Sequence, residues 1–190
     1  MRHLGSKRLE TDRLILCPQT MEEQKYLWSV LMIPEVNKYY LTVPSFLKDK
    51  LKDWDKQEKY YIEGVNKANN PDVYKWSVFL KDDGECIGMV TCQDIEGQPD
   101  SIRDVGWYLD PKYQGKGYGY EAAKRMVDYM FKEVGIDEIR TGAAIVNPSS
   151  WRIMEKLGFK RLDETKMVNY TYIDGETEIY LYNLNKGDYR

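Results

Sequence analysis

The chain has 190 residues, of which 42% are hydrophobic, so it can bury a substantial core as one domain over residues 1–190 without disulfides. Its formal net charge is −3 and no block of arginine and lysine stands out, which argues against a nucleic-acid partner. No apolar run approaches the roughly 20 residues that cross a bilayer, which argues against a membrane partner.

The first half of the chain predicts a strand, two helices and a β-hairpin. The spacing of apolar residues favours helices at residues 21–30 and 49–65. Runs of β-forming residues favour strands at residues 9–16, 75–80 and 85–93. The pair Asp83-Gly84 is typical of the turn in a hairpin, and it joins the last two of these strands.

A strand and an amphipathic helix follow, joined by a glycine-rich turn. We expect the strand at residues 103–109, ended by Pro111. The helix has a buried stripe at three- and four-residue spacing, formed by Ala123, Met126, Val127, Met130, Phe131 and Val134. Gly135 stands where a C-terminal cap belongs.

The last part of the chain predicts three strands around one helix. A strand at residues 138–146 leads into a helix with Asn147 as N-cap, Pro148 at its first position and Gly158 as C-terminal cap. Strands at residues 166–173 and 176–184 follow, joined by a turn at Asp174-Gly175. The order of elements implies a mixed sheet with helices on both faces.

The side chains argue against two common kinds of catalytic centre. His3 is the only histidine, in an N-terminus that we expect to be frayed, so neither a Ser/His or Cys/His catalytic set nor a zinc site is expected. Cys17, Cys86 and Cys92 are odd in number and lack Cys-x-x-Cys spacing, which fits a reduced, cytoplasmic setting.

The sequence Gln114-Gly115-Lys116-Gly117-Tyr118-Gly119 is the most informative motif. Glycines at a helix start leave backbone N–H groups unpaired at the positive end of the helix dipole, which makes an anion site. A P-loop needs Ser or Thr after the lysine, and a Rossmann turn needs glycine at the position of Tyr120. The pattern Gln-x-x-Gly-x-Gly remains, and a turn without a ligand is the plainer alternative.

This pattern resembles the acetyl-coenzyme A loop of the GNAT N-acetyltransferases. Asn147, Ser150 three residues later and the closing Gly158-Phe159 resemble a second motif of that family. Residues 155–159 and 9–16 are similar to the RimJ/RimL-like branch, the ribosomal-protein N-terminal acetyltransferases, although Cys17 stands where the branch usually has arginine. The resemblance covers nearly the whole chain, most specifically residues 104–159, and is weak over residues 20–70.

The resemblance implies an α/β (α+β) fold of GNAT type. Its central sheet is mixed and mostly antiparallel, with about six or seven strands and helices on both faces. In that fold the strands before the glycine turn and before the asparagine splay apart to admit the pantetheine arm. In this chain those strands would be residues 105–109 and 139–146.

The implied function is an acetyl-CoA-dependent N-acetyltransferase without a metal. The acetyl group would go to a primary amine, on a peptide N-terminus or a small molecule, by direct attack in a ternary complex. The turn amides would bind the pyrophosphate, and a backbone N–H near residues 107–109 would polarise the thioester carbonyl. The cofactor-binding residues expected are Leu109, Gln114, Gly115, Lys116, Gly117, Tyr118, Gly119 and Asn147.

Two residues are candidates for proton transfer. Many GNAT enzymes carry a tyrosine seven residues after the asparagine, but Met154 stands there, so Ser150 is the candidate acid. Ser150 would equally serve to satisfy a helix-end amide. Asp104 stands where the branch often carries a glutamate and is the candidate base through a water relay, or simply an acidic residue at a strand start.

Substrate recognition is expected in residues 20–70 and in the last hairpin. The candidate contacts are aromatic, since aromatic faces suit a cationic amine: Tyr39, Tyr40, Tyr60, Tyr61, Tyr170 and Tyr172. Two other functions stay open, a non-catalytic acyl-CoA sensor, suggested by Met154 and the short Asp104, and a phosphate-loop nucleotide enzyme. Edge strands and exposed aromatic residues would support a homodimer.

Overall fold

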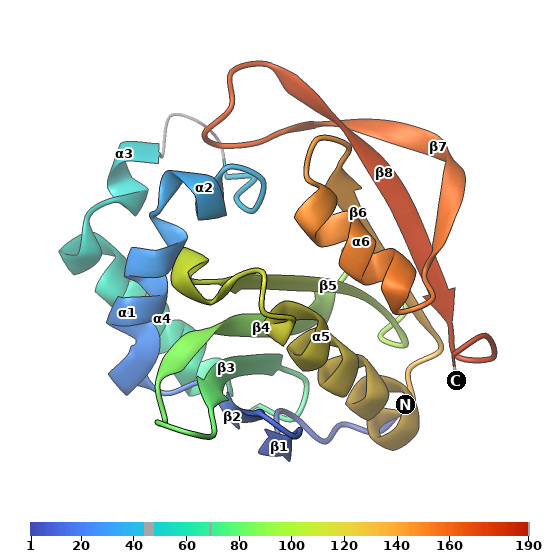
Figure 1. Ribbon diagram of the computed structural model, residues 1–190, viewed down its shortest axis with the longest axis horizontal. Helices are drawn as coiled ribbons and strands as arrows, with labels where there is room; N and C mark the ends of the chain where they lie inside the picture. Colours follow the sequence, from blue (N-terminus) through green and yellow to red (C-terminus); the bar gives the residue numbers. More distant parts are fainter. Residues whose placement is uncertain (44–47, 69, 190) are drawn as a thin grey trace.

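The computed structural model describes residues 1–43, 48–68 and 70–189 (Figure 1). Within these residues one sheet has eight strands in the order β1-β2-β3-β4-β5-β6-β8-β7, and only β5 and β6 pair in parallel. The strands are β1 (Leu9–Glu10), β2 (Leu14–Pro18), β3 (Tyr74–Leu80), β4 (Cys86–Asp94), β5 (Ile102–Leu109), β6 (Glu138–Ala144), β7 (Lys160–Asn169) and β8 (Glu176–Asn185). The predicted mixed, mostly antiparallel sheet is confirmed.

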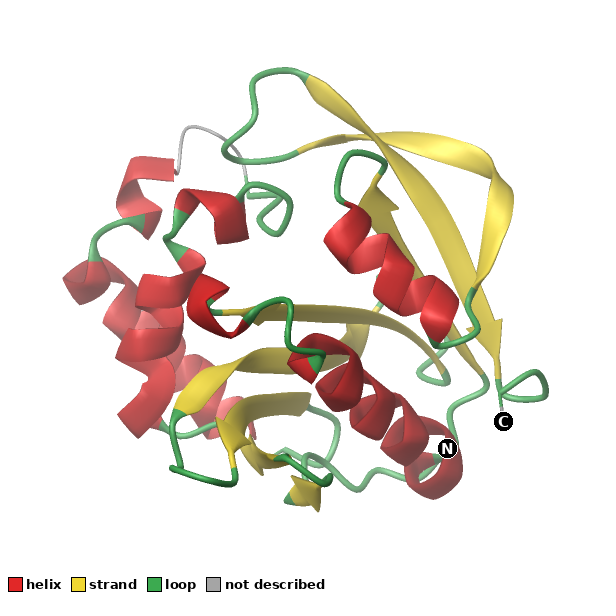
Figure 2. Ribbon diagram, in the orientation of Figure 1, coloured by secondary structure: helices red, strands yellow, loops and turns green. Residues whose placement is uncertain are grey.

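Helices cover both faces of the sheet, as predicted (Figure 2). On β4, Ile87 and Val90 pack in the core beneath α5, whereas Met89 packs with Leu27 and Val30 of α1 on the opposite face. The helices are α1 (Met21–Leu31), α2 (Pro34–Asn37), α3 (Lys48–Leu51), α4 (Trp54–Ala68), α5 (Tyr118–Tyr129) and α6 (Pro148–Lys156). No helix among the described residues has the length and apolar character to span a membrane.

The predicted first strand is two strands, which raises the strand count from the expected six or seven to eight. Thr11 forms a turn at this point, because its backbone N–H donates to the Leu14 carbonyl at 3.0 Å. Its hydroxyl oxygen also accepts from the Leu14 N–H at 2.9 Å. A short polar side chain that competes in this way for backbone groups interrupts a strand.

The predicted helix at residues 49–65 is broken into α3 and α4. Two side-chain donors take carbonyls that a continuous helix would use. The Trp28 indole N–H donates to the Leu51 carbonyl at 2.8 Å, and the Gln57 amide donates to the Lys50 carbonyl at 3.0 Å. The break therefore depends on a tertiary contact from α1, which the local sequence does not contain.

The last hairpin also begins earlier than predicted, because β7 is Lys160–Asn169 instead of residues 166–173. Thr171 is diverted from strand pairing: its N–H donates to the Leu41 carbonyl at 2.8 Å, and its hydroxyl to the Val43 carbonyl at 2.6 Å. The end of the hairpin is thereby joined to the segment that follows α2 (Figure 1).

The expectation of a frayed N-terminus is wrong. Buried aromatic side chains donate to its backbone: the Trp76 indole to the Lys7 carbonyl at 2.7 Å, and the Tyr129 hydroxyl to the Gly5 carbonyl at 2.8 Å. His3 contacts Asp72 at the surface. These donors would be unpaired in the core without the N-terminal segment, so they order it.

Gly88 on β4 allows a close approach that any side chain would block. A Cβ at this position would lie 2.2 Å from the Tyr108 carbonyl oxygen on β5. We expect Gly88→Ala to lower the free energy of unfolding by about 3 kcal/mol, the upper range for overpacking, measured by urea denaturation. Gly187→Ala is the control, because a Cβ there meets nothing within 4 Å. Equal stability of the two variants would contradict this expectation.

Candidate active site

The strands β5 and β6 separate after a short stretch of pairing. They pair at Ile102 with Glu138 and at Arg103 with Ile139. Two residues further along each strand, the Thr141 hydroxyl donates to the Val105 carbonyl at 3.2 Å. Beyond this contact the two strands diverge (Figure 1). The predicted splay is confirmed, and it opens a gap in the middle of the sheet.

The exposed edge of β5 turns two backbone N–H groups into the gap. The Asp110 N–H donates to the Ile87 carbonyl on β4, and antiparallel strands alternate the direction of these groups from residue to residue. The N–H groups of Trp107 and Leu109 therefore point away from β4. Sequence alone left open which amide near residues 107–109 faces the gap, and the register narrows the choice to these two.

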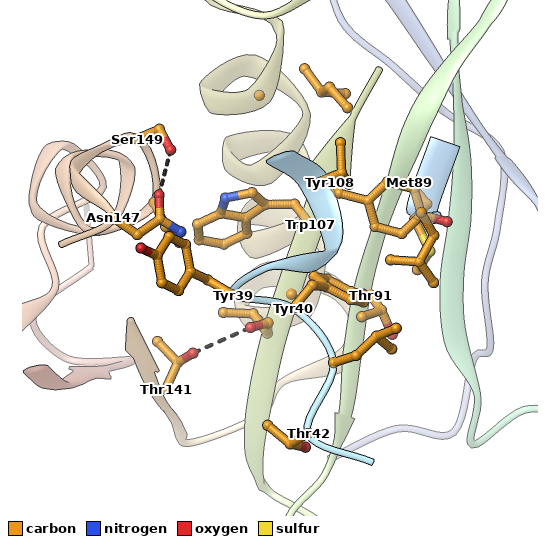
Figure 3. A pocket seen from close by; sticks show the side chains of 18 of the residues that line it. Tyr39, Tyr40, Thr42, Met89, Thr91, Trp107, Tyr108, Thr141, Asn147 and Ser149 are labelled. Carbon is orange, nitrogen blue, oxygen red and sulfur yellow. Dashed lines mark hydrogen bonds between the residues drawn. The ribbon is translucent and has the colours of Figure 1, made fainter. Parts of the chain in front are cut away.

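The gap continues into a cleft of about 1350 Å³. One end is lined by Leu109, the glycine turn and the first residues of α6. The other end is lined by residues of α1, α2 and the segment at residues 39–43. Figure 3 shows Trp107 on one wall, with Asn147 and Tyr39 beside it. The cleft thus joins the predicted anion site to the region where recognition of a second molecule was expected.

The glycine turn (residues 115–119) presents unpaired amides at the start of α5. The first backbone bond of this helix runs from the Glu121 N–H to the Gly117 carbonyl, at 3.1 Å. Among the described residues, none of the six N–H groups of residues 115–120 has a hydrogen-bond acceptor. Gly117 is the N-cap with φ of 86°, a left-handed conformation that favours glycine. Six donors at the positive end of a helix dipole form a cradle for an anion.

The side chain of Gln114 shapes this turn. Its side-chain amide donates to the Leu109 carbonyl at 2.9 Å, which ties the turn to the end of β5. Gln114, Gly115, Gly117 and Gly119 all line the cleft. A Cβ on Gly119 would lie 3.3 Å from Ile153 Cδ1, so this glycine also lets α5 and α6 pack closely.

The side chains of Lys116 and Tyr118 do not line the cleft. The Lys116 ammonium lies 5.5 Å from the ring centre of Tyr113, and the ring of Tyr118 lies under the Arg13 guanidinium at 4.5 Å. These two residues can contribute to an anion site through their backbone N–H groups.

The start of α6 forms the opposite wall of the gap. Asn147 occupies the predicted N-cap position but its side chain makes no cap bond; its Oδ1 instead accepts from the Ser149 hydroxyl at 2.6 Å (Figure 3). Ser150 lines the cleft, and within the described chain its hydroxyl has no hydrogen-bond partner. It does not satisfy a helix-end amide, so its hydroxyl is free to donate into the cleft. Met154, the residue seven positions after Asn147, is also on this helix, and its side chain is 2% exposed.

Asp104 lines the cleft at the base of the splayed strands. Its carboxylate accepts from the Gln93 side-chain amide at 3.1 Å and from the Val105 N–H at 2.8 Å. Burial raises the pKa of Asp104 above its usual value, and hydrogen bonds from Gln93, Thr141 and Val105 partly offset this effect. A carboxylate with a raised pKa is a better base than a fully solvated one.

Aromatic side chains line the end of the cleft formed by α1, α2 and residues 39–43. Tyr39 packs edge-on against Tyr170 at 5.7 Å, and Tyr40 packs against Tyr108 at 5.0 Å. Tyr39, Tyr40, Tyr61 and Tyr170 line the cleft. Tyr172 does not line it, and the side chain of Tyr60 lies outside the described part of the structure. Trp28 lines the same end of the cleft but was not among the predicted contacts. Its position in the apolar stripe of α1 is the feature of the sequence that could have indicated it.

Two hydrogen bonds from Thr171 form a bridge between the segment after α2 and the last hairpin. Thr171 is 4% exposed and holds the carbonyls of both Leu41 and Val43. Leu41 and Val43 line the cleft, so this bridge joins one wall of the cleft to the β7–β8 hairpin.

Comparison with known families supports these observations. The profile of the acetyltransferase (GNAT) domain matches residues 13–160. The chain is 34% identical over 97 residues to the uncharacterized N-acetyltransferase YnaD of Bacillus subtilis. This matched stretch covers 51% of this chain and 56% of YnaD. It is 31% identical to the uncharacterized protein YkkB of the same organism, over 80% of this chain and 84% of that one.

Solved structures share the fold. RimL, a ribosomal L7/L12 alpha-N-protein acetyltransferase in complex with coenzyme A, has a TM-score of 0.78 at 13% identity and covers 94% of this chain and 98% of its own. The spermidine N-acetyltransferase of Vibrio cholerae, in complex with CoA and spermine, has a TM-score of 0.75 at 18% identity, over 94% and 99% of the two chains. At these identities the likeness concerns the fold.

Proposed function

The chain belongs to the GNAT acetyltransferase family, and on that premise we propose that it moves an acetyl group from acetyl-coenzyme A to a primary amine. The acceptor is a peptide N-terminus or a small-molecule amine, bound with acetyl-CoA in a ternary complex. The observation that carries the proposal is the row of six unpaired N–H groups at residues 115–120, beside a gap between two splayed strands.

The residues present fit coenzyme A. The glycine turn would hold the pyrophosphate, with Gln114 fixing the turn and Tyr118 contributing through its backbone. Asn147 and the Leu109 edge of β5 would line the pantetheine arm. When bound, acetyl-CoA supplies an activated acyl group as a thioester. The N–H groups of Trp107 and Leu109 point into the gap, where they would polarise the thioester carbonyl.

Ser150 and Asp104 would handle the protons. The free hydroxyl of Ser150 would donate to the departing thiolate. Asp104 would accept a proton from the amine through water. The need for a base depends on the acceptor: at pH 7 roughly one-tenth of an α-amine with pKa near 8 is uncharged, against about 0.04% of a lysine-like amine.

The aromatic lining of the cleft supports a cationic amine as the acceptor. Tyr39 and Tyr170 both line one end of the cleft and pack against each other at 5.7 Å, and aromatic faces attract a cationic amine. A screen of a dipeptide, a polyamine and Nα-acetyl-lysine, whose only free amine is on the side chain, measured by thiol release from acetyl-CoA, tests this proposal. Thiol release with none of the three amines would contradict it.

Asp104→Asn is expected to lower kcat/KM about 100-fold at pH 7. The deficit should shrink as the pH approaches the pKa of the acceptor amine, because an uncharged amine needs no base. The loss of kcat/KM should be larger for an alkylamine than for an α-amine, because less of the alkylamine is uncharged at pH 7. The measurement is kcat/KM against pH for both kinds of acceptor.

The stability of the same variant provides an independent check. The pKa of Asp104 is raised in the folded protein, so its contribution to stability is present below the unfolded-state pKa and is lost as pH rises through the folded value. Asp104→Asn should therefore be at least as stable as the wild type at pH 7.

The activity measurement can also contradict the proposed role. If kcat/KM of Asp104→Asn and of the wild type depends on pH in the same way, Asp104 is not the base.

A non-catalytic acyl-CoA sensor is the second candidate function. Met154 stands where many family members place a tyrosine, and its thioether has no proton to donate. Binding of acetyl-CoA without thiol release, across the whole amine screen, would favour this alternative over catalysis.

The cellular setting is part of the proposal. All three cysteines are free thiols, which supports a reducing, cytoplasmic location. The outer edge of β7 supports a homodimer, and sedimentation analysis of the purified chain would test it.

A further inference from the structure

Two residues of the N-terminal motif at residues 9–16, Thr11 and Arg13, contact the start of α5 through Glu121. The Arg13 guanidinium donates to Glu121 Oε2 through Nε at 2.7 Å and Nη2 at 2.6 Å. Glu121 Oε1 accepts from the Arg13 backbone N–H at 3.0 Å and from the Thr11 hydroxyl at 2.5 Å. Both carboxylate oxygens are thus held by one turn of the chain.

The third nitrogen of Arg13 holds the glycine turn itself. Nη1 donates to the Lys116 carbonyl at 3.1 Å, and the guanidinium lies 4.5 Å from the ring centre of Tyr118. The peptide between Lys116 and Gly117 is planar and trans, so its carbonyl and its N–H point in opposite directions. Holding the carbonyl towards Arg13 therefore directs the Gly117 N–H to the other side, and Gly117 lines the cleft.

The charges of this contact largely cancel. The side chain of Glu121 is 18% exposed, and an acidic residue in the first turn of α5 would otherwise weaken an anion site. The pKa of Glu121 is lowered: hydrogen bonds from Thr11 and Arg13 outweigh the effect of burial, which acts in the opposite direction. Glu121 is ionised at neutral pH and neutralises Arg13. The contact therefore acts on the shape of the turn more than on its charge.

We propose that Thr11, Arg13 and Glu121 form an N-terminal clamp that holds the Lys116–Gly117 peptide in the orientation that binds the pyrophosphate of coenzyme A. These are positioning residues, which act through the turn amides. The inference rests on the proposed function, because it assumes that the turn binds coenzyme A.

The test compares two ligands that differ in the pyrophosphate. Calorimetric titrations with coenzyme A and with pantetheine, which lacks the nucleotide and its phosphates, would be run on the wild type, Arg13→Ala and Arg13→Lys. We expect Arg13→Ala to raise the Kd for coenzyme A about tenfold, the effect of one charge-assisted hydrogen bond, with the pantetheine Kd unchanged. Arg13→Lys should lie between the two, since it keeps the charge but not the fork of donors.

Arg8→Ala is the matched control. Arg8 belongs to the same N-terminal segment and pairs with Glu10 at the surface, at 3.1 Å and away from the turn. The Kd values of Arg8→Ala for both ligands should therefore equal those of the wild type. A double-mutant cycle with Glu121→Gln adds a second readout. If the clamp acts as a unit, Arg13→Ala with Glu121→Gln should weaken coenzyme A binding no more than Arg13→Ala alone.

The outcomes separate the two proposals. A wild type that binds no coenzyme A overturns the proposed function and the clamp together. A wild type that binds coenzyme A, with Arg13→Ala and Arg13→Lys binding it equally well, overturns only the clamp. Equal weakening of coenzyme A and pantetheine would show a general loss of structure and also overturn it. If Arg13→Ala does not fold, Arg13→Lys and Glu121→Gln give the same comparison.

Discussion

Replacement of Gly117 by tryptophan is expected to raise the Kd for coenzyme A by at least about 100-fold, which is roughly 2.7 kcal/mol. Gly117 has φ of 86° and lines the cleft at the start of α5. An L-residue in the left-handed region costs roughly 1–2 kcal/mol, so the turn would tend to rearrange and its N–H groups would no longer converge. The Cβ of the new residue would also lie 3.4 Å from Arg13 Nη2, so the indole would crowd the side chain that holds this turn. Isothermal titration calorimetry measures the change.

Gly84→Trp is the matched control for this variant. Gly84 has φ of 74° in the turn between β3 and β4, and a Cβ there meets nothing within 4 Å. It carries a similar backbone cost far from the glycine turn, so it should lose stability but keep the wild-type Kd. Unchanged binding by Gly117→Trp would mean that the anion cradle does not hold coenzyme A.

Ser150→Ala is expected to lower kcat about 100-fold, within the range for loss of a general acid, and to leave the KM for acetyl-CoA near its wild-type value. The Ser150 hydroxyl lines the cleft without a partner in the described chain, so its removal disturbs no internal hydrogen bond. Steady-state kinetics with the best acceptor of the amine screen measures both constants.

Ser149→Ala provides the comparison within the same turn of α6. The Ser149 hydroxyl donates to Asn147 Oδ1, so it is already engaged and is not available to a leaving group. We expect its kcat to stay near the wild-type value. Equal losses in the two variants would show that the start of α6 matters only structurally. A wild-type kcat in Ser150→Ala would remove Ser150 from the chemistry.

Much of the half of the cleft that we propose binds coenzyme A could be predicted from the sequence, because its signals are local. Glycines at a helix start, the apolar stripe of α5 and the Gly135 cap each act within a few residues of the chain. Pro148 and Gly158 bound α6 in the same way. Gln114 follows from its place in the motif, and its bond to the Leu109 carbonyl spans only five residues.

The acceptor half could not be predicted, since distant contacts shape it. Trp28 interrupts the helix that the periodicity of residues 49–65 favoured, and Thr171 leaves its expected strand to bind the segment after α2. The role of Arg13 depends on Glu121, which lies 108 residues away in the sequence. Composition and spacing describe what a segment prefers alone, and these contacts override that preference.

The most direct test of the proposed coenzyme A site is a thermal-shift titration of the wild-type chain with acetyl-coenzyme A, with ATP in parallel. A ligand at one hundred times its Kd stabilises the folded state by roughly 2.7 kcal/mol, which gives a clear rise in melting temperature. We predict a saturable rise with acetyl-coenzyme A and none with ATP. A rise with ATP and none with acetyl-coenzyme A, over several ligand concentrations, would contradict the proposed acetyltransferase and favour a nucleotide-binding turn.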